Sequence, residues 1–176
     1  MRFETLIELY HDQIYGYLWR LLNSAGSADS AIEAQDLAQE VFLRAFRAYG
    51  RLRRDSNHRA WLYKIATNCA YTALKRGQRQ ASHSVSLGDE VQRLPDGAQP
   101  SPDAQLVLDE ALQAVWQEIA ALPPKQQAAL VLRYGQSLDY ATIAQALNCS
   151  EDSARANVYQ ALRRLRRELA PQNGAS

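Results

Sequence analysis

The sequence predicts an all-α protein with two small helical domains, an N-terminal helical bundle and a C-terminal helix-turn-helix. A proline-rich acidic linker joins them. Apolar residues recur at helical spacing through most of the 176 residues. Residues 79–102 lose that spacing and are dense in proline and glycine, which disfavour helix. We therefore predict domains at residues 1–78 and 103–176, with the linker at 79–102.

The composition indicates a folded protein that needs no cofactor. Hydrophobic residues make up 47% of the chain and charged residues 22%, which is typical of globular proteins. No apolar run approaches the roughly 18 residues needed to cross a bilayer, and the acids near the N-terminus are unlike a secretory signal. We expect a cytoplasmic protein without direct membrane insertion. Cys69 and Cys149 are far apart, so we expect neither a disulfide nor a metal site.

Three helices are expected before the linker. The first takes about 20 residues from Phe3 and ends at the break that begins with Asn23. The second runs from about residue 30 to residue 49 and stops at a glycine. The third is capped by Ser56 or Asn57 and ends at Gly77.

Four helices are expected after the linker, and the last two predict a helix-turn-helix. A short helix, a tight turn and a longer basic helix at the end of a small unit are typical of that motif. The expected helix starts are Asp103, Pro123-Pro124, Asp139 and Ser150. The last helix extends to about Ala170, just before a proline.

The charge is unevenly distributed, although the formal net charge is only +1. Residues 51–80 carry a net charge of +7 and lie between residues 1–50, at −3, and residues 81–120, at −6. Residues 121–176 carry +3. Such a basic block creates a local positive field. Charge alone favours a nucleic-acid partner and a merely solvated helix face equally.

The final helix is a candidate for duplex DNA. An apolar stripe is expected to pack on the preceding helices, and the opposite side is polar and basic. Amide and guanidinium groups on such a side can contact base edges in a major groove, while the C-terminal arginines meet phosphates. The alternative is a surface helix with solvated arginines. The polar side presents Ser153, Ala156, Gln160, Arg163, Arg164 and Arg167, with Arg155 and Tyr159 at one edge.

The third helix carries a face suited to a single nucleic-acid strand. Trp61, Lys64, Asn68, Tyr71 and Lys75 are spaced by three or four residues and lie beside the apolar stripe. Bases can stack on such rings, at roughly 1–3 kcal/mol per base, while lysines follow the phosphates. Alternatively, Trp61 could cap the core and Tyr71 could pack against the first helix.

The second helix places three acids, Glu33, Asp36 and Glu40, on nearly one face. No histidine joins them, so a docking surface for a basic partner is favoured over a metal site. Its apolar residues Leu37, Phe42 and Leu43 cannot all fit one buried stripe, which also indicates docking. The three histidines are scattered, and no phosphate loop or nucleophile motif is present, so the sequence favours a protein that is not an enzyme.

Several runs of residues resemble the sigma factors of the extracytoplasmic-function group of the sigma-70 family. The resemblance covers both halves of the chain and fails only in the linker. The runs are AQDLAQEVFLRAFR at 34–47, AWLYKIATN at 60–68, LPPKQQ at 122–127, LRY at 132–134 and LDYATIA at 138–144. Together and in this order they are specific. The resemblance implies a transcription initiation factor that directs core RNA polymerase to promoters.

The resemblance also implies roles for individual residues and partners. Core polymerase, through the clamp helices of its large subunit, would be bound by Asp36, Leu37, Gln39, Glu40 and Leu43. The minus-ten element would meet Arg53, Arg54, Asn57, Trp61, Lys64, Asn68, Tyr71 and Lys75, with a flipped base in the loop before the third helix. The minus-thirty-five duplex would meet Arg133, Ser153, Arg155, Ala156, Tyr159, Gln160 and Arg163. An anti-sigma protein would hold the factor inactive, and the free protein would be a monomer.

The final helix departs from the family pattern. Asn157 and Gln160 stand where the family commonly has basic residues, and Ala156 where it commonly has serine. Fewer charges there predict a weaker salt-dependent contribution to DNA binding. Two rival functions stay open, a dimeric helix-turn-helix repressor and a small helical enzyme. The repressor would explain the C-terminal half but not the face that begins at Trp61.

Overall fold

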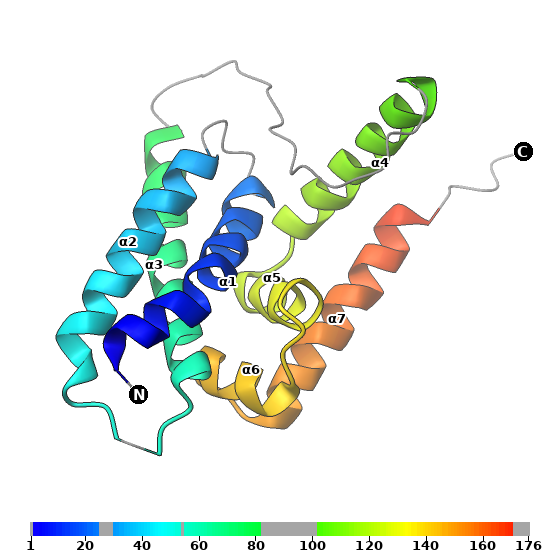
Figure 1. The fold of residues 1–176 in the computed structure, drawn as a ribbon. Helices are drawn as coiled ribbons and strands as arrows, with labels where there is room; N and C mark the ends of the chain where they lie inside the picture. Colours follow the sequence, from blue (N-terminus) through cyan, green and yellow to red (C-terminus); the bar gives the residue numbers. More distant parts are fainter. Residues whose placement is uncertain (1, 25–29, 54, 82–101, 171–176) are drawn as a thin grey trace, which may run out of the picture.

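The structure, a computed structural model, describes residues 2–24, 30–53, 55–81 and 102–170. Within these ranges the chain forms seven α-helices and one short π-helical turn, and contains no strand (Figure 1). The predicted all-α class is therefore confirmed. The elements are α1 Phe3–Ser24, α2 Ser30–Tyr49, α3 His58–Ala81, α4 Pro102–Ala120, α5 Pro124–Leu130, η1 Val131–Gly135, α6 Tyr140–Leu147 and α7 Glu151–Leu169. No described helix combines the length and the apolar character that a bilayer span requires.

Helices α1, α2 and α3 pack side by side around an apolar core. The hydroxyl groups of Tyr17 in α1 and Thr67 in α3 lie 2.8 Å apart and form a buried hydrogen bond. The ring of Tyr63 meets the ring of Tyr17 edge to face at 5.3 Å. Burial raises the pKa of Tyr17 far above its ordinary value, so its hydroxyl stays protonated. A neutral hydrogen bond thus crosses the centre of this bundle.

The observed helix boundaries confirm most of those expected from the sequence. Asn57 caps α3, because its Oδ1 accepts a hydrogen bond from the backbone N–H of Ala60 at 3.0 Å. The predicted end of this helix at Gly77 is wrong, because α3 continues to Ala81. Gly77 is exposed and has free space around it, and one exposed glycine costs a helix only about 1 kcal/mol. That cost is too small to stop a helix of this length.

The helix-turn-helix predicted near the C-terminus is confirmed, with both caps in place. The Asp139 side chain accepts a hydrogen bond from the N–H of Thr142 at 2.7 Å at the start of α6. The Ser150 side chain accepts one from the N–H of Ser153 at 3.1 Å at the start of α7. Between the two helices, Asn148 adopts a left-handed conformation with φ of 52° and ends α6. These local interactions set the angle at which α7 leaves the turn.

The Asp139 cap gives a prediction about stability and pH. Hydrogen bonds from Thr142, through its hydroxyl and its backbone N–H, hold the pKa of Asp139 below its ordinary value of 3.8. A lowered pKa stabilises the fold above pH 3.8, and this contribution is lost as the pH falls through the pKa of the folded state. Asp139→Ala should lower the free energy of unfolding by about 0.5–2 kcal/mol at neutral pH and by less in acid. Urea unfolding at pH 7 and pH 3 measures both values.

Asp139→Asn is the matched control for this prediction, because asparagine is also a good cap but carries no ionisable group. It should lose less stability than Asp139→Ala at both pH values, and in both variants the loss should be smaller in acid, because the contribution of the ionised Asp139 to the wild type is then gone. An equal loss in both variants would mean that the cap contributes through the charge of Asp139 and not through its hydrogen bond.

The two helical units are packed against each other. One core cluster takes buried residues from α1 to α3 and also from α5, η1, α6 and α7, and α6 packs against the N-terminal part of α3 (Figure 1). Arg59 Nη2 donates to the backbone oxygen of Gln136 at 3.2 Å, and the Tyr63 hydroxyl donates to Gln136 Oε1 at 3.0 Å. The Trp19 and Trp116 rings meet edge to face at 6.3 Å. The sequence leaves this arrangement open, and the structure shows a closed one.

Candidate nucleic-acid and docking surfaces

The face of α3 predicted to contact a strand is continuous in the structure. Lys64, Asn68 and Lys75 are exposed, while Trp61 and Tyr71 between them are half-buried. The Trp61 ring lies 6.4 Å from the ring of Tyr49 and packs partly against the core. The sequence left two positions open for Trp61, on the polar face or over the core, and the ring occupies part of each. One portion of the ring joins the core and the rest lies on the polar face.

Tyr71 makes a contact that the sequence did not predict. Its hydroxyl donates to the backbone oxygen of Pro124, at the start of α5, at 2.8 Å. The expected alternative was a contact with the first helix, whereas this hydrogen bond reaches the C-terminal unit. Burial raises the pKa of Tyr71 to about 12, so the hydroxyl is a neutral donor at physiological pH. Tyr71 therefore joins the two units and also contributes to the α3 face.

The loop before α3 forms one wall of an open hollow of about 390 Å³. Trp61 and Lys64 from α3 and Asn57 from the loop supply a ring, a cation and an amide. This combination can stack on a base extruded from a strand, hydrogen-bond its edge and neutralise a phosphate. Gln145, on α6, also lines the hollow. Sequence reasoning missed Gln145, because only the packing of α6 on α3 brings it there.

Arg53 and Arg59, near this hollow, have different surroundings. Arg53 is exposed, and its Nε lies 3.4 Å from Asp55 Oδ1. Arg54, also predicted to contact the minus-ten element, lies outside the described residues. Arg59 is half-buried and donates to Gln13 Oε1 at 3.1 Å as well as to the C-terminal unit. Arg59 therefore contributes to inter-unit packing as well as to the basic charge of residues 51–80.

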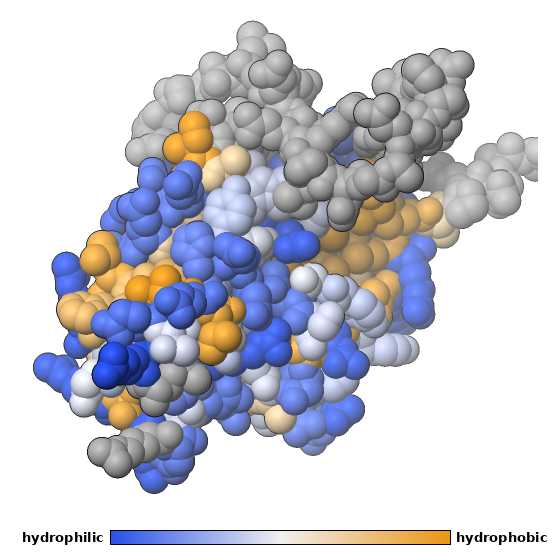
Figure 2. Space-filling model, in the orientation of Figure 1, coloured by the Kyte–Doolittle hydropathy of each residue, from blue (hydrophilic) through white to orange (hydrophobic). Residues whose placement is uncertain are grey.

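The predicted docking residues of α2 lie on one side of the helix. Asp36, Gln39 and Leu43 are exposed, and Leu37 and Glu40 are partly exposed. We call the exposed part of this side the α2 surface; it comprises Asp36, Gln39, Glu40, Leu43 and Phe46. Figure 2 shows hydrophobic side chains among hydrophilic ones over α2. Among the residues that the structure describes, no group of three His, Cys, Asp or Glu side chains could hold a metal ion.

The structure shows which of two neighbouring phenylalanines of α2 is buried. Phe42 is buried, with 8% of its surface exposed, and its ring stacks on that of His11 at 6.0 Å. The ring packs against α1, so it cannot be part of a docking surface. Phe46 is 65% exposed and was missed, although it follows Gln39 by seven residues, which places both on one helix face.

An ion pair within the helix constrains the acid at the centre of the α2 surface. Arg44 Nε lies 2.6 Å from Glu40 Oε1. This hydrogen bond holds the pKa of Glu40 below its ordinary value, with further lowering by the charges of Arg44 and Arg47. Glu40 is therefore ionised at physiological pH and lies beside Leu43, with its charge partly offset by Arg44 and Arg47. Exposed Asp36 adds a second acid, and a basic group on a partner is complementary to it.

The predicted duplex-binding face of α7 is exposed along its length. Ser153, Arg155, Ala156, Tyr159, Gln160 and Arg163 are all exposed. Arg155 is paired with Glu151, one turn earlier, at 2.6 Å. Arg133, assigned to the same duplex, is half-buried in η1, and its Nη1 donates to the backbone oxygen of Leu138 at 2.8 Å. Six of the seven predicted residues thus share one helix, and the seventh lies in the preceding element.

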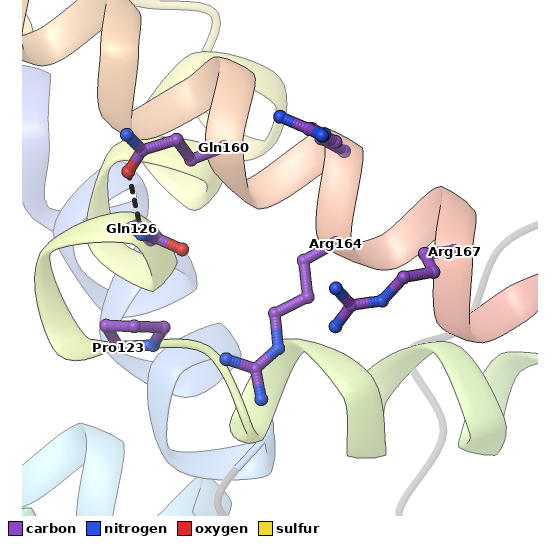
Figure 3. Close-up of a pocket in the computed structure, with 6 residues that line it drawn as sticks. Pro123, Gln126, Gln160, Arg164 and Arg167 are labelled. Atoms are coloured by element: carbon purple, nitrogen blue, oxygen red, sulfur yellow. Dashed lines mark hydrogen bonds between the residues drawn. The ribbon is translucent and has the colours of Figure 1, made fainter.

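An arginine-rich groove of about 500 Å³ lies next to this face (Figure 3). Gln126 of α5 donates to Gln160 Oε1 at 3.0 Å across one end of the groove. Arg164 and Arg167 extend from α7 towards the end of α4 (Figure 3). Buried Arg164 Nε has no hydrogen-bond partner among the described residues. Pro123 and Arg163 complete the lining. Arg167 is paired with Glu168 at 2.6 Å, so Arg163 and Arg164 are the cations of the groove that favour an anion such as a DNA phosphate.

Comparisons with known proteins agree with this geometry. Residues 6–80 match the family model of sigma-70 region 2, and residues 112–165 match that of sigma-70 region 4. The RNA polymerase sigma-H factor of Pseudomonas aeruginosa is 34% identical over 173 residues, which cover 96% of this chain and 86% of that protein. The ECF RNA polymerase sigma factor SigW of Bacillus subtilis is 27% identical over 173 residues, covering 95% and 88%.

A solved structure has the same fold. The sigma factor RpoE of Bartonella quintana, crystallised with the anti-sigma factor NepR, superposes with a TM-score of 0.69 over 97% of this chain and 98% of that chain, at 21% sequence identity. The region 2 model covers the half of the chain that contains α3, and the region 4 model covers the half that contains the helix-turn-helix. The chain belongs to the sigma-70 family of RNA polymerase sigma factors, in its extracytoplasmic-function group.

Proposed function

We propose that three surfaces of this sigma factor direct core RNA polymerase to promoters and start transcription. The α2 surface docks on the clamp helices of the polymerase large subunit. The α3 face and the hollow beside it hold the non-template strand of the minus-ten element. The exposed face of α7, with Arg133, binds the minus-thirty-five duplex. The protein acts in the cytoplasm as a binding subunit and not as an enzyme.

The α3 face is the observation that carries this proposal. Two aromatic rings, Trp61 and Tyr71, lie on it with the exposed cations Lys64 and Lys75. Rings and cations in one line suit a strand whose bases are unstacked, because every base offers a face for stacking and every phosphate a charge. An ordinary repressor that binds closed duplex has no use for such a face. The hollow lined by Asn57 adds a place for one extruded base.

The closed arrangement of the two units must open for this function. The names of the two promoter elements place them about 25 base pairs apart, which is on the order of 85 Å of duplex at about 3.4 Å per base pair. Units that share a hydrophobic core cannot occupy both elements at once. The contacts of Asn57 with Thr142 and of Tyr71 with Pro124 also engage residues assigned to the strand. DNA and the C-terminal unit therefore compete for α3.

Regulation by an anti-sigma protein fits the same surfaces. The Bartonella sigma factor was crystallised with such a protein. A partner that covers the α2 surface would block polymerase, and one that stabilises the contact between α3 and α6 would keep the two units closed. We propose an anti-sigma protein as the regulator and a monomer as the free form.

Transcription in vitro tests the proposed function. The full chain, with and without core polymerase, is presented with a library of promoter fragments. We expect the mixture, and not either component alone, to select fragments with two separated, non-palindromic elements and to open them. Selection of palindromes by the chain alone, as a dimer, would contradict the proposal and support a repressor.

Tyr71 offers a test that separates the contact between units from the contact with the strand. Tyr71→Phe removes the hydroxyl that binds Pro124 and keeps the ring, so strand binding by the holoenzyme should be maintained or increased. Tyr71→Ala removes the ring as well and should weaken binding of a minus-ten single strand about 5- to 150-fold, given roughly 1–3 kcal/mol per stacked base. Fluorescence anisotropy with a labelled oligonucleotide measures both variants.

Tyr134→Phe is the control for these variants, because Tyr134 is 63% exposed and belongs to η1 and not to α3. It should bind the strand as the wild type does. If Tyr71→Phe binds as weakly as Tyr71→Ala, the hydroxyl and not the ring contacts the strand, and the stacking role of Tyr71 is wrong.

A further inference from the structure

The ring of Tyr140 contacts arginines from two different elements, η1 and α7, and the sequence did not predict these contacts. Tyr140 is the first residue of α6, and two guanidinium groups lie over its ring. The Cζ of Arg133, from η1, is 4.7 Å from the ring centre, and the Cζ of Arg155, from α7, is 4.6 Å from it. Both distances are within the range of cation–π attraction. Both arginines are residues that the proposed function assigns to the minus-thirty-five duplex.

The surroundings of these groups fix their positions. The Tyr140 backbone follows the Asp139 cap directly, so the start of α6 holds the ring. Arg133 Nη1 is bound by the backbone oxygen of Leu138 at 2.8 Å, and Arg155 Nη2 by Glu151 Oε1 at 2.6 Å. Arg133 is half-buried and Arg155 is exposed. Arg133 is thus anchored within the protein, whereas Arg155 extends from the helix that would enter the groove.

The Tyr140 ring also reduces the repulsion between the two guanidinium groups. Two guanidinium groups that approach the same ring repel each other, and the carboxylates of Glu151, beside Arg155, and Asp139, near Arg133, offset part of that repulsion. The negative face of an aromatic ring attracts cations and offsets that repulsion. An arginine that lies flat on a ring also keeps its edge N–H groups free to donate. Stacking on Tyr140 therefore limits the motion of Arg155 without consuming all of its hydrogen-bond donors.

We infer that Tyr140 is a positioning residue for promoter recognition, whose ring holds the Arg155 guanidinium in the orientation from which it contacts a base edge. This inference rests on the proposed function of α7. Two parallel N–H donors of arginine match O6 and N7 of guanine in the major groove. That match requires a fixed guanidinium plane, which a freely rotating exposed arginine does not have. Contact with the Tyr140 ring holds the plane of the Arg155 guanidinium, and Arg133 stabilises the position of the ring.

A positioning role predicts a loss of discrimination that is confined to one base pair. The holoenzyme is measured on its preferred promoter duplex, found from the library, and on duplexes with single substitutions in the minus-thirty-five element. Tyr140→Leu should reduce discrimination at the base pair contacted by Arg155 about 5- to 10-fold, while discrimination at the other positions stays unchanged. Tyr140→Phe keeps the ring and should behave as the wild type.

A double-mutant cycle completes the test. In an Arg155→Ala background, Tyr140→Leu should cause no further loss at that base pair, because the group that the ring positions is absent. Tyr134→Leu, at a tyrosine that is 63% exposed, is the control for general effects of the substitution. Thermal unfolding of each variant, followed by circular dichroism, shows whether the helical fold is retained.

Two results would overturn the inference. Equal, sequence-independent losses in Tyr140→Phe and Tyr140→Leu would make the hydroxyl a phosphate contact. Additive losses from Tyr140→Leu and Arg155→Ala would mean that the two residues act separately. Failure of the wild-type holoenzyme to select any promoter would instead contradict the proposed function, so the two failures are distinguishable.

Discussion

Asp36→Arg combined with Glu40→Arg is expected to abolish binding of this sigma factor to core RNA polymerase. The two acids lie one helical turn apart on the α2 surface, beside Leu43, which is 52% exposed. Reversing both charges replaces attraction to a basic partner with repulsion. Loss of a hydrogen-bonded charge pair that is buried in an interface costs about 2–5 kcal/mol, so we expect a complex about 30-fold weaker or more.

The loss should not come from unfolding. Glu40→Arg also breaks the pair with Arg44, but an exposed pair of this kind contributes little to stability. Glu4→Arg with Glu8→Arg is the matched control, because both acids are exposed on α1, four residues apart, and the change in net charge is identical. Anisotropy of labelled protein titrated with core polymerase measures the affinity. If the control loses as much affinity as the α2 variant, net charge and not the α2 surface governs binding.

Trp61→Ala is expected to have the second largest effect, on promoter opening. The ring forms a wall of the hollow beside α3 and lies on the face proposed to hold the strand. One stacked base contributes roughly 1–3 kcal/mol, so opening should be weakened about 5- to 150-fold, while binding to core polymerase is unchanged. Trp61→Phe keeps an aromatic face and should recover most of the activity. Permanganate footprinting of melted thymines measures the opening.

A control is needed because part of the Trp61 ring also packs against Tyr49 in the core. Trp116→Ala removes a ring of the same size from α4, which also packs partly against buried residues but lies away from the hollow. It should cost stability without a specific effect on opening. If Trp61→Ala and Trp116→Ala reduce opening equally, Trp61 acts only through the core, and the stacking role is wrong.

Interactions that are local in sequence explain what could be predicted about the fold. Helical spacing of apolar residues, the caps at Asn57, Asp139 and Ser150 and the break after Leu147 all act within a few residues. Their physical basis, the 3.6-residue repeat and the unpaired N–H groups at a helix start, is contained in a short window of sequence. The exposed faces of α3 and α7 follow from the same repeat, which is why most candidate site residues lie where they were expected.

The tertiary structure alone decided which surfaces meet. Gln145 reaches the hollow beside Trp61 because α6 packs on α3, and these helices are far apart in the chain. Phe42 is buried and Phe46 exposed because the position of α1 decides which of two neighbouring apolar rings is covered. A helical repeat indicates that one side of α2 is apolar, but it does not define the edge of the buried area.

The sequence by itself determined seven helices, the caps at Asp139 and Ser150, the helix-turn-helix and the polar faces proposed to meet polymerase and promoter. Only the tertiary structure showed that both units share one core, that Tyr71 joins them and that Tyr140 brings Arg133 and Arg155 together. The physical reason is the range of the interactions. Backbone hydrogen bonds and caps connect residues a few positions apart, whereas packing and cation–π contacts depend on distances in space that the order of residues does not contain.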